Sequence, residues 1–186
     1  VRGNTPLHTV ADAEAAEYLI ERGAKVDAPN SSGHKPIQTT PSGEVARLLV
    51  RKGAVAFWAD PGDAFGRNQP LTLAIEGRRP ETALALMDMG ADPRTARDPG
   101  SLLRAAAQQG HLPLVEALLG KGIAPGAADM YGMTALHGAA LGGSYWALAK
   151  LVVAQFNDGL DIRFEALERA RQEGRKLFEE RFRRLE

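Results

Sequence analysis

The apolar positions of the chain recur at a nearly constant interval. Leucine or isoleucine anchors recur with a period of about 33 residues, at Leu7, Ile37, Leu71, Leu103 and Leu136. Further apolar residues follow each anchor at helical spacing, which is typical of helices with one buried face. Loop segments then separate one such unit from the next. This pattern predicts a series of helix–turn–helix units, each burying its apolar face against its neighbours.

A glycine closes each of the first four units. These glycines begin short related segments, Gly23-Ala24, Gly53-Ala54, Gly90-Ala91-Asp92 and Gly122-Ile123. Glycine is common at helix ends because it adopts a positive φ at no steric cost. The anchor lies three positions closer to its glycine in the first two units than in the next two. We therefore expect a shorter first helix, or a shorter turn after it, in the first two units.

Two units begin with nearly the same four residues, Thr5-Pro6-Leu7-His8 and Thr134-Ala135-Leu136-His137. Together with the repeat period, this motif resembles the ankyrin repeat. The segment from Gly110 to Leu119 is also close to the family pattern, whereas the second, third and fourth units depart from it at Lys35, Gln69 and Ser101. The likeness covers about residues 3–155. It implies an all-α solenoid of stacked helix pairs with projecting hairpin loops.

The resemblance divides the chain into five repeats, at about residues 1–29, 30–60, 61–95, 96–128 and 129–163. Residues 164–186 are highly charged but carry an apolar stripe, at Leu177, Phe178, Phe182 and Leu185. We expect this tail to form a helical cap or a degenerate sixth repeat, because the end of a solenoid needs a polar outer face. The chain opens on Val1 inside a repeat, so we expect upstream sequence to be missing.

Composition adds few constraints on the partner. The 186 residues carry 23 basic and 23 acidic side chains, so electrostatics does not favour nucleic acid or an anionic membrane. The absence of cysteine excludes disulfides and thiolate metal sites and leaves the compartment open. No apolar run reaches the roughly 18 residues of a membrane-spanning helix, and no signal peptide is visible. The cytoplasm is favoured, the periplasm or secretion stays open, and we expect a monomer.

Histidine is the side chain most often used in catalysis and metal binding, and the chain has four. For His8 and His137 the ankyrin resemblance implies a structural bond to the threonine that opens the repeat. For His111 it implies a structural place in the turn between helices, and we expect His34, in a loop, to be solvated. No metalloprotease, nucleophile-elbow or phosphate-loop motif occurs. We therefore expect no enzyme activity, no metal and no cofactor.

Aromatic residues in two places are candidates for partner recognition, because exposed aromatics are enriched at binding hot spots. Phe57, Trp58 and Phe65 lie in a lengthened loop, where packing against a neighbouring repeat is the alternative. Tyr145 and Trp146 begin a second helix, at positions that are normally polar in the repeat register. The resemblance adds residues of the loop tips and of the concave row of first helices: Arg67, Arg94, Arg97, Gln108, Gln109, Met130, Tyr131, Met133 and Leu141.

The predicted function is protein–protein recognition through preordered loop tips and a concave helix face. Preorder limits the conformational entropy lost when a partner docks. Two alternatives stay open: an inhibitor or immunity-type protein that blocks a partner enzyme, and the targeting domain of a larger enzyme. We expect no small-molecule substrate and no nucleic acid.

Overall fold

The computed structural model describes residues 3–55 and 69–157, leaving 1–2, 56–68 and 158–186 undescribed. The described residues form α-helices and two short 3₁₀ helices, and the all-α prediction is confirmed for them. In chain order these elements are η1 Pro6–His8, α1 Ala13–Glu21, α2 Pro36–Thr39, α3 Gly43–Arg51, α4 Pro70–Glu76, α5 Pro80–Asp88, η2 Pro93–Thr95, α6 Pro99–Gln109, α7 Leu112–Gly120, α8 Ala135–Gly142 and α9 Tyr145–Asn157.

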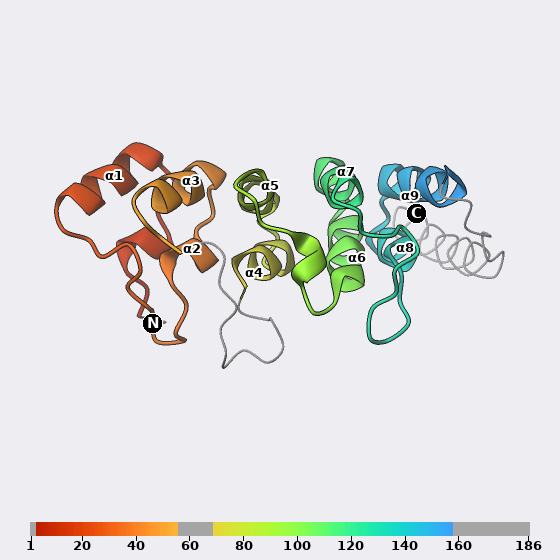
Figure 1. The fold of residues 1–186 in the computed structure, drawn as a ribbon, viewed down its shortest axis with the longest axis horizontal. Helices are drawn as coiled ribbons and strands as arrows, with labels where there is room; N and C mark the ends of the chain where they lie inside the picture. Colours follow the sequence, from red (N-terminus) through yellow and green to blue (C-terminus); the bar gives the residue numbers. More distant parts are fainter. Residues whose placement is uncertain (1–2, 56–68, 158–186) are drawn as a thin grey trace, which may run out of the picture. The chain divides into compact units, whose positions relative to one another are not determined.

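The chain divides into two compact units, Val1–Arg97 and Asp98–Glu186. In the first unit the second helices α1, α3 and α5 pack in order, and the first elements η1, α2 and α4 form another row (Figure 1). In the second unit α6 packs on α8 and α7 packs on α9 (Figure 1). Each first element also contacts the second helix that follows it, so the described elements form five successive helix pairs.

The repeating apolar anchors form the core of these pairs. All five are buried, and the second-helix residues Val45, Leu48 and Leu49 are buried with them. The first elements of the first two pairs span three and four residues, whereas α4, α6 and α8 span seven, eleven and eight. The shorter separation of anchor and glycine therefore shortens the first helix, as predicted.

The helix ends follow from local side chains. Asp12 Oδ2 accepts a 2.8 Å hydrogen bond from Ala15 N at the start of α1, and Ser42 and His111 cap α3 and α7 in the same way. The four glycines predicted to end second helices all have positive φ: 92° at Gly23, 96° at Gly53, 107° at Gly90 and 85° at Gly122. The positive φ of these four glycines ends the second helices at these positions.

A half-buried arginine joins the second and third helix pairs. Arg79 Nη1 donates to Thr40 O (3.0 Å), and its Nη2 donates to Gln38 O (2.8 Å) and Leu73 O (2.7 Å). These carbonyls lie at the carboxyl ends of α2 and α4, where the helix dipole favours a cation. Burial nevertheless lowers the pKa of Arg79. Arg79 was not among the predicted residues.

Two glycines bring α8 close to α6 in the second unit. A Cβ atom on Gly138 would overlap Arg104 O, and one on Gly142 would overlap Gln108 O. Both glycines lie four positions apart on one face of α8, which lets the two helix backbones approach more closely than larger side chains would permit.

Candidate protein-interaction surface

The loop before α8 is organised by one carboxylate. Asp129 Oδ1 accepts hydrogen bonds from Tyr131 N and Met133 N, both at 2.9 Å, and Asp129 N donates to Met133 O at 2.8 Å. Gly132 supplies the positive φ of this tight loop, 76°. These bonds, together with Gly132 N donating to Asp129 O at 2.9 Å, hold the loop in one defined conformation.

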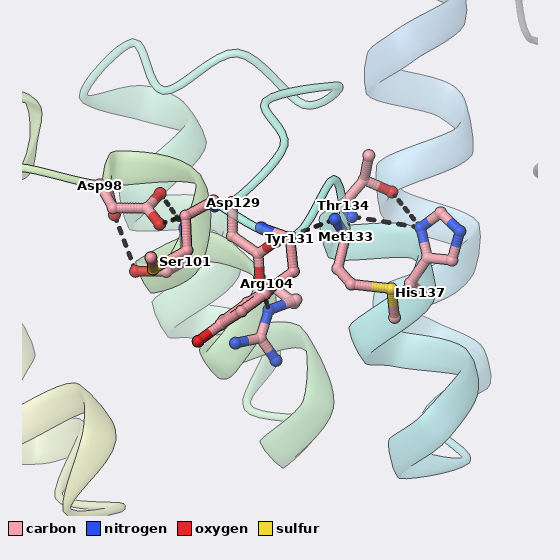
Figure 2. Close-up of polar contacts among 9 residues, drawn as sticks. Asp98, Ser101, Arg104, Asp129, Tyr131, Met133, Thr134 and His137 are labelled. Atoms are coloured by element: carbon pink, nitrogen blue, oxygen red, sulfur yellow. Dashed lines mark hydrogen bonds and ion pairs between the residues drawn. The ribbon is translucent and has the colours of Figure 1, made fainter.

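The first helix of the preceding pair, α6, and the residue before it hold the same loop from outside (Figure 2). Arg104 Nε lies 2.7 Å from Asp129 Oδ2, forming an ion pair with a carboxylate that is only 2% exposed. Asp98 Oδ2 accepts from Met130 N at 3.2 Å, while its Oδ1 accepts from Ser101 N at 2.9 Å at the start of α6. The fourth helix pair therefore clamps the loop of the fifth.

The electrostatics of the clamp favour the charged form of Asp129. Burial by itself raises the pKa of this carboxyl, but the N–H groups of Met133 and Tyr131 and the charge of Arg104 outweigh burial. The pKa of Asp129 therefore lies below its ordinary value. A carboxylate that stays ionised keeps both its backbone bonds and its ion pair at neutral pH.

The side chains at the tip of the loop are apolar and exposed. Met130 is 75% exposed and Tyr131 78%, and Met133 beside them is half-buried. The loop at residues 30–34 has the same backbone arrangement, since Asn30 Oδ1 accepts from Ser32 N (2.9 Å) and His34 N (3.0 Å). Its exposed tip, however, carries Ser31 and Ser32.

The histidines of the repeat motif have the structural role that the resemblance implied. His8 Nδ1 accepts from Thr5 N at 3.0 Å, and its Nε2 lies 2.9 Å from His34 O. His137 Nδ1 accepts from Thr134 N at 3.1 Å (Figure 2). Both Nδ1 atoms are thus acceptors, which places the proton on Nε2. His34, expected to be solvated, is half-buried, because its backbone joins the loop that His8 contacts.

The predicted residues of the first-helix row lie in the second unit. Gln108 and Gln109 are half-buried near the end of α6, and Leu141 is exposed near the end of α8. Tyr145 and Trp146 are exposed at the start of α9, with Trp146 79% accessible. The structure therefore leaves the predicted apolar side chains of α8 and α9 accessible to solvent.

The other predicted residues lie elsewhere. Arg94 is exposed in the first unit, but its guanidinium binds Asp92 through Nε (3.0 Å to Oδ1) and Nη2 (2.7 Å to Oδ2). This pairing raises the pKa of Arg94. Arg97 is exposed at the end of the same unit. Phe57, Trp58, Phe65 and Arg67 lie outside the described residues.

Neither a metal-binding cluster nor a membrane-spanning helix occurs among the described residues. Within residues 3–55 and 69–157 no group of three or more His, Asp or Glu side chains is placed to hold a metal ion. None of the helices described there is long and apolar enough to cross a membrane.

The loop contacts made by Asn30, Asp98, Arg104 and Asp129 were not predicted. For two of them a signal was present, because Asn30 and Asp129 each stand three positions before a glycine, at equivalent places in their repeats. Arg104 and Asp98 reach the loop from the preceding repeat, and no local pattern marks contacts between residues so distant in sequence.

Comparison with known families agrees with the repeat pattern. Residues 102–152 match the family described as "Ankyrin repeats (many copies)", and residues 2–31 match the family "Ankyrin repeat". The chain matches none of the curated proteins compared with it. Ankyrin repeats are in general non-catalytic modules that bind other proteins. The two matches and the stacked helix pairs identify the chain as an ankyrin repeat protein, with the all-α solenoid fold of that family.

Proposed function

We propose that the chain binds a partner protein through the loop at residues 129–133 and the adjoining surface of α6 and α8. The observation that carries this proposal is the contrast between a fixed backbone and exposed apolar side chains. Asp129, Asp98 and Arg104 hold the backbone, while Met130 and Tyr131 remain more than two-thirds exposed. A preordered loop loses little conformational entropy on binding, so more of the contact energy appears as affinity.

The apolar tip is not needed for the fold. The loop at residues 30–34 forms the same backbone hydrogen bonds with serines at its tip. The loop geometry therefore does not require the apolar surface that Met130 and Tyr131 expose, and exposing that surface to water costs free energy. Burying each of them in an interface would contribute about 1.5–3 kcal/mol, and tyrosine is among the residues enriched at hot spots.

The proposed surface extends from the tip along the first helices. Met133, Gln108, Gln109 and Leu141 supply its apolar and hydrogen-bonding groups. Phe57, Trp58, Phe65, Arg67, Arg94 and Arg97 stay predicted contributors.

Affinity capture tests this proposal. Tagged wild-type chain, a Met130→Ser/Tyr131→Ser variant and a Tyr18→Ser control are used to capture proteins from a lysate of the source cells. Tyr18 is also an exposed tyrosine, on α1, so the control removes similar surface at another place. We expect one or more proteins to be captured by the wild type and the control and lost with the double variant. Equal capture by a folded double variant would reject the proposed surface.

The identity of a captured protein also separates the two narrower functions. An enzyme whose activity falls when the chain binds would favour an inhibitor. A captured protein that the chain leaves active would favour a scaffold or targeting role.

A further inference from the structure

One face of α9 is apolar and is not covered by any other part of the chain that the structure describes. Tyr145, Ala149 and Val153 follow one another at four-residue spacing, so they share one face of the helix. Tyr145 is 67% exposed, Val153 is 55% exposed, and Ala149 is also exposed. Trp146 borders this face. These four residues form the α9 face.

Three of the four preceding second helices, α1, α3 and α7, show what this face is turned toward. They and α9 can be aligned on the residue just before each helix, which is Asp12, Ser42, His111 and Ser144 in turn. In this alignment Ala149 corresponds to Glu17, Arg47 and Glu116.

Each of those three charged residues forms an ion pair with the next helix or its end. Glu17 Oε1 lies 2.8 Å from Lys52 Nζ at the end of α3, and Arg47 Nη2 lies 2.7 Å from Asp88 Oδ2 of α5. Glu116 Oε1 lies 2.8 Å from Lys150 Nζ of α9. The position of Ala149 is therefore the one that faces the following second helix.

A second position supports the same orientation. Gly43 corresponds to Tyr145, because each directly follows the aligned residue. A Cβ on Gly43 would lie 2.7 Å from Glu81 O and 3.1 Å from Ala85 Cβ, both in α5. Tyr145 and Ala149 thus occupy the two positions that contact the next second helix in earlier pairs. In α9, Ala149 stands where α1, α3 and α7 carry a charged residue, so a helix packed here would make an apolar contact.

We propose that the occupant of the α9 face is the chain's own segment 176–185. This segment carries Leu177, Phe178, Phe182 and Leu185, whose spacings of one, four and three place them on one side of a helix. Leu177 to Leu185 and Tyr145 to Val153 each cover eight residue steps, about 12 Å in a helix, so the two apolar stripes have matching lengths.

The connection favours this segment over a separate molecule. Residues 158–175 join α9 to it, and a connection of this length reaches far beyond the roughly 8–10 Å that separates packed helices. A tethered segment also acts at a local concentration of about millimolar, which a second copy or a partner seldom reaches. The inference does not depend on the proposed partner site. It assigns Tyr145 and Trp146 to an internal contact, and it keeps the predicted cap at residues 164–186 as part of the same proposal.

Disulfide trapping in the full chain tests this contact, because the wild type contains no cysteine. One variant combines Ala149→Cys with Phe178→Cys and a second combines Ala149→Cys with Phe182→Cys. The matched control combines Ala149→Cys with Arg183→Cys, on the polar side of the same segment. Under mild oxidation, we expect an intramolecular disulfide to form at least tenfold faster in the two test variants than in the control.

Tryptophan fluorescence supplies a second readout that needs no cysteine in the chain. In a Trp58→Phe chain, Trp146 is the one remaining tryptophan. Phe178→Asp/Phe182→Asp should shift its emission to longer wavelength by several nanometres, whereas Arg183→Ala should not. Equal disulfide rates in all three cysteine pairs, or disulfide-linked dimers as the main product, would overturn the proposal. Trp146 emission that is identical in every variant would also overturn it.

Discussion

Arg104 Nε lies 2.7 Å from Asp129 Oδ2, and this ion pair fixes the loop of the fifth helix pair to α6, the first helix of the fourth pair. The same carboxylate accepts two backbone hydrogen bonds through Oδ1. Asp129 therefore has two separable roles, one inside the loop and one between repeats. Substitutions at this position can distinguish them.

Asp129→Ala should cost more stability than Asp129→Asn. Asparagine keeps an oxygen for Tyr131 N and Met133 N, as Asn30 does in the earlier loop, and loses only the ion pair. We expect a loss of about 1 kcal/mol for asparagine and about 2–4 kcal/mol for alanine, which leaves the two N–H groups without an acceptor and Arg104 without its ion-pair partner. Urea unfolding followed by circular dichroism measures both values. Equal losses would show that the loop bonds contribute little.

The clamp should also weaken in acid. Because the pKa of Asp129 is lowered in the folded chain, its stabilising effect is fully present above the unfolded pKa, near 4. It is lost as pH falls through the lower folded pKa. The difference in unfolding free energy between wild type and Asp129→Asn should therefore be constant from pH 7 to about 5 and shrink below pH 4. A difference that stays constant down to pH 2 would argue against this role.

Arg79→Ala should destabilise the first unit. The change removes three hydrogen bonds from a charged donor to the ends of α2 and α4. Hydrogen bonds to charged groups contribute about 1.5–3 kcal/mol each, and bonds that share one side chain do not add in full. We expect a net loss of about 3 kcal/mol, with Arg79→Lys intermediate because an ammonium lacks the planar fork. Arg78→Lys is the control, since Arg78 is exposed. If Arg79→Ala unfolds at the same urea concentration as the control, the bridge is not stabilising.

Arg78 itself is the one non-glycine residue with positive φ, 56°, among those described. It stands two positions before the start of α5, as Gly143 stands two positions before that of α9, where φ is 68°. We expect Arg78→Gly to stabilise the chain by about 1 kcal/mol, because it relieves a left-handed conformation. Gly143→Ala should cost a similar amount, since no atom would obstruct its Cβ. Thermal unfolding of both variants checks the sign, and destabilisation by Arg78→Gly would contradict it.

Local features of the sequence predicted most of the fold. The anchors, the stop glycines and the Thr–His motif each act within a few residues, so their spacing alone indicates where helices begin and end. The contacts of Arg79 with Gln38 and Thr40, and of Asp98 with Met130, join residues from different repeats. Such contacts depend on how neighbouring repeats pack. The ankyrin resemblance predicted Met130 and Tyr131 as loop-tip residues, whereas the contacts that hold the loop were not predicted.

Calorimetric titration of a purified partner tests the central claim most directly. The partner obtained by capture is titrated into wild type, Met130→Ser/Tyr131→Ser and Tyr18→Ser, each shown to be folded by circular dichroism. We predict that the double substitution weakens binding about 100-fold, corresponding to about 2.7 kcal/mol, and that Tyr18→Ser changes the dissociation constant less than twofold. A double variant that binds within twofold of wild type would contradict recognition through the clamped loop.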